Sequence, residues 1–330
     1  MAVNHERIRS GFIGALLGTF VGDALGAPLE GRAGRRHLKD GPVREMIDGR
    51  HSRGCYTDDT QMMIALAEAL IESDGEPTPE LIIDRFLANY DPSRGYGWGA
   101  HKLMQLWKKG ADWQQAACQI FPDGSFGNGA AMRIAPVGVL YHGDRAKLGE
   151  LARLSAKITH AHPLGVQGAL LQAHAIGLAI RYRRGGTLSP ANFILDLLAL
   201  ARDEFHLYRE KLLIIKDFLD SPRSRSPNGA RKVARALGVG FTAPDSVPTA
   251  IFSFLIHHSS FEDAVVFAVN LGGDADTIGA MCGAVAGAYL GIEAIPDRWL
   301  DALEDGVKGR TYVSSLADRL FELWLRRFRA

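Results

Sequence analysis

The sequence predicts an all-α fold, and three observations support this prediction. Apolar side chains recur with helical spacing along most of the 330 residues, whereas the strict alternation typical of strands is scarce. Short segments rich in glycine and proline separate the helical stretches. No shift in composition and no repeat of fixed period marks a boundary, so we expect one compact domain over residues 1–330.

The first expected helix lies in the apolar segment 11–29, GFIGALLGTFVGDALGAPL. This segment follows Arg7 and Arg9 and therefore resembles a signal peptide or a membrane span. Asp23 interrupts it, which favours a buried helix instead. Residues 277–291 are also apolar, but they are too few for a span, so we expect a second buried helix there.

Residues 60–72 place apolar side chains at 62, 63, 66, 67 and 70, which is one face of a helix. The same spacing predicts further helices over residues 148–158, 164–182, 191–201, 261–269 and 314–328. The apolar run 247–256 cannot be assigned by periodicity alone. Loops are expected at 75–79, 91–97, 122–129 and 221–229, of which the last is the most loop-like.

Two series of glycines occur at four-residue spacing within the two apolar segments. They are Gly14, Gly18, Gly22 and Gly26, and Gly279, Gly283, Gly287 and Gly291. On a helix each series forms a groove that a second backbone can approach closely. Each interior glycine costs about 1 kcal/mol relative to alanine, so four in register indicate tight packing. We expect two buried helices that bring Glu30 towards Asp274 and Asp276.

Composition narrows the class of protein. The chain has 38 basic and 37 acidic side chains, which argues against binding to nucleic acid or to a membrane surface. Three cysteines, Cys55, Cys118 and Cys282, form no CxxC pair and cannot all pair with one another. A reducing compartment suits this pattern, and we expect a cytoplasmic protein.

Carboxylates and hydroxyls gather in three places along the chain. These are Asp23 with Glu30, then Thr57, Asp58, Asp59 and Thr60, and finally Asp274, Asp276 and Thr277. Oxygen ligands suit Mg²⁺ or Mn²⁺ better than zinc, and their number exceeds what one Mg²⁺ takes from a protein. Each group alone fits a helix N-cap, but a cap needs one such residue, and adjacent carboxylates repel one another without a cation or hydrogen bonds. We therefore expect two divalent metal ions.

Residues 124–129, GSFGNG, are able to cradle a ligand. Glycines let backbone N–H groups converge on phosphate oxygens, and Phe126 is able to stack on a base or sugar. Turns use the same residue types, as does the GYGWG run at 95–99, so neither run is specific alone. His160 fits either a hydrogen-bonded structural histidine or a substrate contact.

Five runs together resemble the ADP-ribosylglycohydrolases: GALLGTFVGDALGAPLEG, YTDDTQMMIALAEAL, GSFGNGAAMRIAPVGVL, THAHPLG and NLGGDADTIGAMCGAVAGAYLG. They occur in order over residues 14–291. The resemblance implies an orthogonal helical bundle with two Mg²⁺ or Mn²⁺ ions. The implied ligands are Thr57, Asp58, Asp59, Asp274, Asp276 and Thr277, with Glu30 near the metals on a mobile loop. The same resemblance implies catalytic roles for Glu30, Asp58 and Asp59.

The resemblance also implies an ADP-ribose site. Its residues would be Asp123, Gly124, Ser125, Phe126, Gly127, Asn128 and Gly129 around the diphosphate and adenosine, His160, Gly97 and Gly99 as further contacts, and Ile251 beside the adenine. The runs DPSRGYGWGA, GSFGNGAAMR and SVPTAIFSFL are similar to the branch that acts on ADP-ribosyl-serine, O-acetyl-ADP-ribose and poly(ADP-ribose). Phe126 stands where that branch often has tyrosine, which keeps stacking but removes a hydroxyl.

The expected activity is hydrolysis of the bond at C1″ of the distal ribose, through a transition state with oxocarbenium character. The expected partners are ADP-ribosylated proteins or O-acetyl-ADP-ribose, with O-linked substrates preferred. Three alternatives stay open. They are an ADP-ribosyl-arginine hydrolase, a binding or structural protein similar to the lens crystallins of the wider family, and a two-metal phosphohydrolase, which would release phosphate instead of ADP-ribose.

Overall fold

The computed structural model describes residues 5–31, 41–201, 205–221 and 227–328. This part of the chain forms 17 α-helices and no strand, so the predicted all-α class is confirmed. The helices are α1 (His5–Gly26), α3 (Asp58–Glu72), α4 (Pro79–Asn89), α5 (Trp98–Lys108), α6 (Trp113–Ile120), α7 (Gly129–Met132), α8 (Ala135–Leu140), α9 (Arg145–Lys157), α10 (Pro163–Gly185), α11 (Pro190–Leu200), α12 (His206–Leu219), α13 (Pro227–Leu237), α14 (Ala243–Ile256), α15 (Phe261–Val269), α16 (Ala275–Leu290), α17 (Asp297–Ala302) and α18 (Arg310–Phe328). Short 3₁₀ turns lie at η1 (Ala27–Leu29), η2 (Pro92–Arg94) and η5 (Ile292–Ala294).

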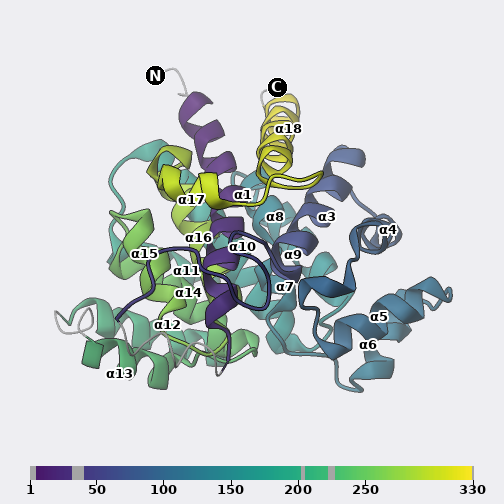
Figure 1. Ribbon diagram of the computed structural model, residues 1–330, viewed down its shortest axis with the longest axis horizontal. Coiled ribbons are helices and arrows are strands. Elements are labelled where there is room, and N and C mark those ends of the chain that lie inside the picture. The colour runs from purple at the N-terminus through teal and green to yellow at the C-terminus, as the bar shows by residue number, and fades with distance from the viewer. Residues whose placement is uncertain (1–4, 32–40, 202–204, 222–226, 329–330) are drawn as a thin grey trace.

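The centre of the molecule is the antiparallel pair α1 and α16 (Figure 1). The two glycine series face each other across this pair. A Cβ atom at Gly14, Gly18 or Gly22 would collide with the carbonyl oxygens of Gly287, Gly283 and Gly279 respectively. The predicted close packing of two buried helices is therefore confirmed. It brings the last turn of α1 beside the first turn of α16, where the acidic residues lie.

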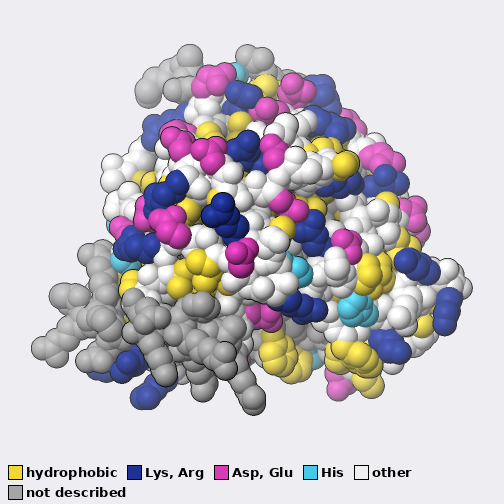
Figure 2. All heavy atoms as spheres, viewed as in Figure 1, with side chains coloured by type: hydrophobic (Ala, Val, Ile, Leu, Met, Phe, Trp, Pro, Cys, Tyr) yellow, Lys and Arg dark blue, Asp and Glu magenta, His cyan; other side chains and the backbone are white. Residues whose placement is uncertain are grey.

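Other helices surround this pair. Helices α10, α14 and α15 pack against α16, and α3 and α18 pack against α1. In Figure 1, α5 and α6 project from one side of the molecule and α12 and α13 from the other, while the two termini lie at the same end. On the face shown in Figure 2, acidic and basic side chains are interspersed, which fits the net charge of +1.

Two segments are long and apolar enough to cross a membrane by length and composition: His5–Leu29 and Pro163–Gly185. In the structure 94% and 78% of their most apolar windows are buried inside the protein. Both are therefore core helices of this fold, as predicted for the first of them. The second was expected as an ordinary helix.

Several boundaries differ from the predicted ones. Helix α3 begins two residues earlier than predicted, because Thr57 caps it. The ambiguous run 247–256 is the buried helix α14, which contains Pro248. Of the loop predicted at 221–229, residues 222–226 lie outside the described residues, and Pro227 begins α13. The spacing did not single out α4, α5, α6, α8, α12 or α13, which have 6–14 residues and offer few repeats of the apolar pattern.

Candidate active site

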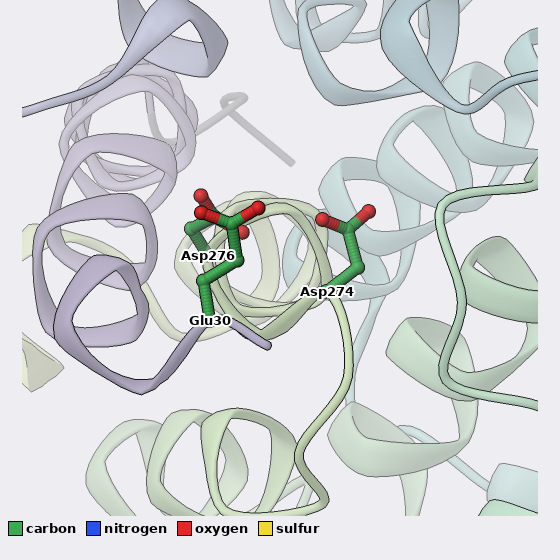
Figure 3. Close-up of side chains that lie close together, drawn as sticks. All are labelled: Glu30, Asp274 and Asp276. Atoms are coloured by element: carbon green, nitrogen blue, oxygen red, sulfur yellow. The ribbon is translucent and has the colours of Figure 1, made fainter. Parts of the chain in front are cut away.

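Three helix ends converge on one side of the central pair. Ligand oxygens of Glu30, Asp274 and Asp276 all lie within 4.8 Å of one another. Figure 3 shows the three carboxylates pointing to the same side, Glu30 from the segment after α1 and the two aspartates from the start of α16. The backbone N–H of Gly31 donates to the carbonyl of Gly273 at 2.9 Å, which fastens the Glu30 segment beside Asp274.

Asp23, in the last turns of α1, lies beneath this cluster and is fully buried. Its carboxylate accepts hydrogen bonds from the hydroxyls of Thr57 (2.8 Å) and Thr60 (2.6 Å). The backbone N–H groups of the same two threonines also donate to it, at 3.0 Å and 3.1 Å. Asp23 therefore fixes the first turn of α3 against α1, where Asp58 and Asp59 begin their helix.

Helix capping explains only part of the acidic cluster. Thr57 is the N-cap of α3 and accepts from the N–H of Asp59 at 3.4 Å. Asp274 is the N-cap of α16, but its side chain makes no capping bond. It accepts instead from the amide of Asn128 at 2.5 Å. Asp59 Oδ2 lies 3.4 Å from the hydroxyl of Thr277, whereas its buried Oδ1 has no hydrogen-bond partner among the described residues.

The carboxylates of the cluster lie close together and lack an ion-paired cation among the described residues. Within the described ranges, no lysine, arginine or histidine forms an ion pair with any of its six carboxylates: Asp23, Glu30, Asp58, Asp59, Asp274 and Asp276. Burial, followed by the charge of Asp23 and then of Asp274, raises the pKa of Asp58 to about 8. Burial and then Asp23 and Asp276 raise the pKa of Asp59, and burial and then Asp274 raise that of Glu30. Holding these groups ionised therefore requires added positive charge.

The donor set fits divalent cations. It consists of carboxylate and hydroxyl oxygens, the ligands that Mg²⁺ and Mn²⁺ prefer, and the described residues add no cysteine or histidine within the three-carboxylate group. The unpartnered Oδ1 of Asp59 is a buried oxygen free to bind a cation. The structure thus contains an acidic cluster able to hold a metal ion.

Five of the six carboxylates, all except Asp23, line a cavity of about 480 Å³, a size typical of small-molecule sites. Most residues expected at the site line this cavity: Glu30, Thr57, Asp58, Asp59, Gly97, Gly99, Gly124, Ser125, Phe126, Gly127, Asn128, Gly129, His160, Asp274, Asp276 and Thr277. Asp123 is exposed and lies outside the lining. Ile251, which was expected beside the adenine, lies in the middle of α14, is 0% exposed, and is not among the residues that line this cavity.

The glycine loop at 124–129 also lines the cavity. Its backbone pairs with the segment before α14, through Asn128 N–H to Phe241 O (3.0 Å) and Ala243 N–H to Phe126 O (2.9 Å). Gly124 adopts φ +80°, and a Cβ there would collide with the backbone of His162, so this turn requires glycine. Asn128 links the loop directly to Asp274.

Four exposed aromatic side chains surround the mouth of the cavity. They are Trp98, Phe121, Phe126 and Phe241, with exposed fractions of 62%, 38%, 46% and 74%. Trp98 contacts Phe121 edge to face, with ring centroids 6.2 Å apart. Gly99 leaves room for Phe121, because a Cβ there would lie 2.8 Å from the ring. Exposed rings beside a cavity provide flat apolar surfaces for a base or sugar.

The sequence analysis missed several residues of this site. Asp23 was noted only as an acidic residue, although its carboxylate accepts hydrogen bonds from both Thr57 and Thr60 and so positions the start of α3. Arg133, which also lines the cavity, is a lone cation in the apolar run AAMRIAPVGVL, and that isolation was a usable signal. Phe241 carries no sequence pattern that marks it as part of a cavity, whereas Trp98 lies in the GYGWG run, of which only Gly97 and Gly99 were expected as contacts.

Comparisons with known proteins show the family to which the chain belongs. The family model described as ADP-ribosylglycohydrolase matches residues 4–329. The chain is 33% identical to ADP-ribosylhydrolase ARH3 of Bos taurus, over 96% of this chain and 94% of that protein. It is 32% identical to ADP-ribosylhydrolase ARH3 of Homo sapiens, over 96% and 95% of the two chains. An uncharacterized protein of Archaeoglobus fulgidus is 33% identical over 96% and 97%.

A solved structure, titled ADP-ribosylglycohydrolase-related protein complex, superposes with a TM-score of 0.72 at 31% identity, covering 96% of this chain and 99% of that one. The match therefore extends through the whole helical fold as well as through the acidic runs that build the cavity wall. Enzymes of this kind act on substrates that contain ADP-ribose. The chain belongs to the ADP-ribosylglycohydrolase family and is a glycosyl hydrolase that acts on ADP-ribose linkages.

Proposed function

We propose that the protein releases ADP-ribose from O-linked substrates and uses two Mg²⁺ or Mn²⁺ ions held by the acidic cluster. The observation that carries the metal part is the set of six carboxylates without any ion-paired cation in the described residues, with Asp59 Oδ1 left unpartnered. The ligands would be Glu30, Thr57, Asp58, Asp59, Asp274, Asp276 and Thr277. Two cations held there would supply charge that orients ribose hydroxyls and lowers the pKa of a bound water.

The chain's own residues supply orientation around the bond that breaks. Asp23 holds the first turn of α3 and thereby places Asp58 and Asp59. Asn128 donates to Asp274 and lies in the glycine loop, so this hydrogen bond joins the acidic cluster to the loop. A distal ribose at the cluster and a diphosphate at the loop would then occupy neighbouring parts of the same cavity.

Glu30 is the residue that we assign to proton transfer. Its side chain is exposed at the cavity, and burial and the charge of Asp274 raise its pKa above the ordinary value of a glutamate. A carboxylate there is able to take a proton from the attacking water or to give one to the leaving group. The positive charge that develops on C1″ as the glycosidic bond breaks would lie near the carboxylates of the cluster.

The aromatic rim suits the other end of the substrate. Phe126 and Phe241 flank the paired backbone of the glycine loop and expose their rings at the cavity mouth. We place the adenosine there, because base stacking on such rings needs no particular hydrogen bond. Phe241 takes the place at the adenine side that the sequence analysis gave to Ile251.

The preference for O-linked substrates rests on the runs GYGWG, GSFGNGAAMR and SVPTAI. Serine and arginine adducts join the same ribose carbon and differ in the leaving group. A serine alkoxide is a poor leaving group and needs assistance from a proton or a cation. Selectivity should therefore arise near Glu30 and the acidic cluster rather than at the aromatic rim.

The test compares two matched peptides, one with ADP-ribosyl-serine and one with ADP-ribosyl-arginine, at equal concentration with Mg²⁺. We expect faster release of free ADP-ribose from the serine peptide. Faster release from the arginine peptide would overturn the linkage preference. Release of phosphate instead of ADP-ribose, or no release from either peptide by the metal-loaded protein, would overturn the proposed hydrolysis and favour a phosphohydrolase or a binding role respectively.

A further inference from the structure

The wall of the cavity beneath the glycine loop contains a buried cation. Arg133 is 0% exposed, and no carboxylate forms an ion pair with it in the described part of the chain. Its guanidinium donates to the carbonyls of Gly129 (3.0 Å) and Ser155 (2.6 Å) and to the hydroxyl oxygen of Thr159 (2.9 Å). Arg133 therefore joins the end of the glycine loop to the end of α9.

The hydrogen bond from Arg133 to Thr159 fixes the direction of the hydrogen bond between Thr159 and His160. A guanidinium has no acceptor, so the Thr159 oxygen must accept from it. The hydroxyl has one proton, and the ring nitrogen Nδ1 of His160 lies 2.7 Å from the same oxygen. Thr159 is only 4% exposed, and within the described residues no other acceptor lies within hydrogen-bond distance of its hydroxyl. The proton of Thr159 thus goes to Nδ1, which must carry a lone pair.

The same surroundings keep the imidazole neutral. Burial, and then the positive charge of Arg133, lower the pKa of His160 to about 3. A neutral ring with a lone pair on Nδ1 carries its single proton on Nε2.

The Nε2 atom faces the glycine loop. A Cβ at Gly129 would lie 3.0 Å from Nε2 and 2.7 Å from Cε1 of His160, and a Cβ at Gly127 would lie 3.3 Å from Nε2. Glycine at both positions keeps side chains away from this nitrogen, and His160 is one of the residues that line the cavity. A donor at this place points at the space where the loop's N–H groups would hold an anionic ligand.

We infer that Thr159, oriented by Arg133, is a positioning residue that fixes His160 as an Nε2–H donor to an oxygen of the nucleotide bound at the glycine loop. The ligand half of this inference rests on the proposed function, whereas the tautomer is a property of the free protein. The Nε2–H group of His160, with the cation of Arg133 behind it, favours a phosphate or hydroxyl oxygen of the ligand. A ligand N–H at the same place would find no acceptor.

The tautomer is read directly from histidine-labelled free protein by ¹⁵N NMR, with the His160 resonances assigned from their absence in His160→Asn. We expect Nδ1 to give the shift of a hydrogen-bonded, unprotonated nitrogen and Nε2 that of a protonated one, unchanged between pH 5.5 and 8. In Thr159→Val the Nδ1 resonance should move to the position of an unprotonated nitrogen without a hydrogen bond, while in Thr159→Ser it should stay. A proton on Nδ1 in the unmodified protein would overturn the inference.

Binding of free ADP-ribose tests the ligand half without any turnover. Thr159→Val should weaken binding by about fivefold to tenfold, the effect expected from one misplaced hydrogen bond, and Thr159→Ser should restore it. Thermal unfolding of both variants shows whether the fold is intact. Equal affinity of folded Thr159→Val and Thr159→Ser would overturn the positioning role. Because neither readout depends on hydrolysis, either can fail while the proposed function holds.

Discussion

Asp23 on α1 accepts a 2.8 Å hydrogen bond from the hydroxyl of Thr57 at the start of α3, although the two residues are 34 positions apart. Thr57 is both the N-cap of α3 and an expected metal ligand, so its orientation bears on helix stability and on metal binding at once. Asp23 is buried and accepts hydrogen bonds from four donors, the N–H and hydroxyl groups of Thr57 and Thr60. These bonds explain how a carboxylate is buried here without an ion-pair partner.

The first prediction concerns this pair. Asp23→Asn replaces an acceptor oxygen by a donor that faces the N–H and hydroxyl groups of Thr57 and Thr60. We expect a loss of about 1–3 kcal/mol in the free energy of unfolding and a smaller rise of the melting temperature on adding Mg²⁺ or Mn²⁺. Denaturant unfolding and thermal scans measure the two effects. Thr60→Val removes only one of the four donors and should lower the free energy of unfolding by less. An unaltered melting-temperature response to metal in Asp23→Asn would contradict the role of this carboxylate.

The second prediction concerns the close contact of α1 and α16. Gly18→Ala would place a methyl group against the backbone of Gly283, which cannot give way without separating the helices. We expect a loss of about 1–3 kcal/mol in the free energy of unfolding. Gly185→Ala is the matched control, because it also lies in a helix but has open space around it, and it should be neutral or stabilising by up to about 1 kcal/mol. Equal stability of the two variants would refute the packing argument.

A third prediction is the effect of acid on His142. Burial lowers the pKa of this histidine to about 4, below its ordinary value of 6.5, although its Nδ1 bonds the carbonyl of Val139. The folded state therefore binds fewer protons than the unfolded state between these two pH values, and the stability that neutral His142 allows is lost as pH falls from about 6.5 to 4.

His142→Phe keeps the ring among Phe12 and Trp324 but removes the titration. Groups common to both proteins cancel in the difference between their unfolding free energies. This difference should shift in favour of the variant as pH falls through the window from 6.5 to 4. A difference that does not change with pH would show that His142 does not titrate on unfolding.

The fourth prediction concerns the aromatic rim. Phe126 is 46% exposed and contacts His162 edge to face at 5.3 Å between ring centroids, so its outer face is available for stacking. Phe126→Ala should weaken binding of ADP-ribose by about tenfold, whereas Phe126→Tyr should bind at least as well as the unmodified protein. Calorimetric titration gives both values. Unchanged affinity in Phe126→Ala would place the base elsewhere.

The sequence predicted the fold class and the convergence of the acidic segments because both depend on regular spacing. Glycines four residues apart define one face of a helix, and that face had to meet another backbone, as Gly18 meets Gly283. Once α1 and α16 are paired, Glu30 and Asp276 must lie near each other. The short helices α5 and α6 could not be predicted in this way, because they bury few residues each.

The burial of Ile251 could not be predicted from the sequence for a different reason. Ile251 lies in the apolar run SVPTAIFSFL, and such a run does not reveal which side of the helix faces a cavity. In the structure Ile251 faces the core. Phe241, which does reach the cavity mouth, owes its place to the backbone pairing of Asn128 with the segment before α14. Such long-range pairing of irregular segments leaves no periodic trace in a sequence.

The most direct test of the account measures release of ADP-ribose from an ADP-ribosyl-serine peptide by metal-free protein to which Mg²⁺ is returned. The account predicts no release without the metal, restored release with it, and no restoration in a folded Asp274→Asn/Asp276→Asn variant, whose melting temperature should also no longer rise on adding Mg²⁺. Equal release by the unmodified protein and by this variant, with or without Mg²⁺, would contradict it.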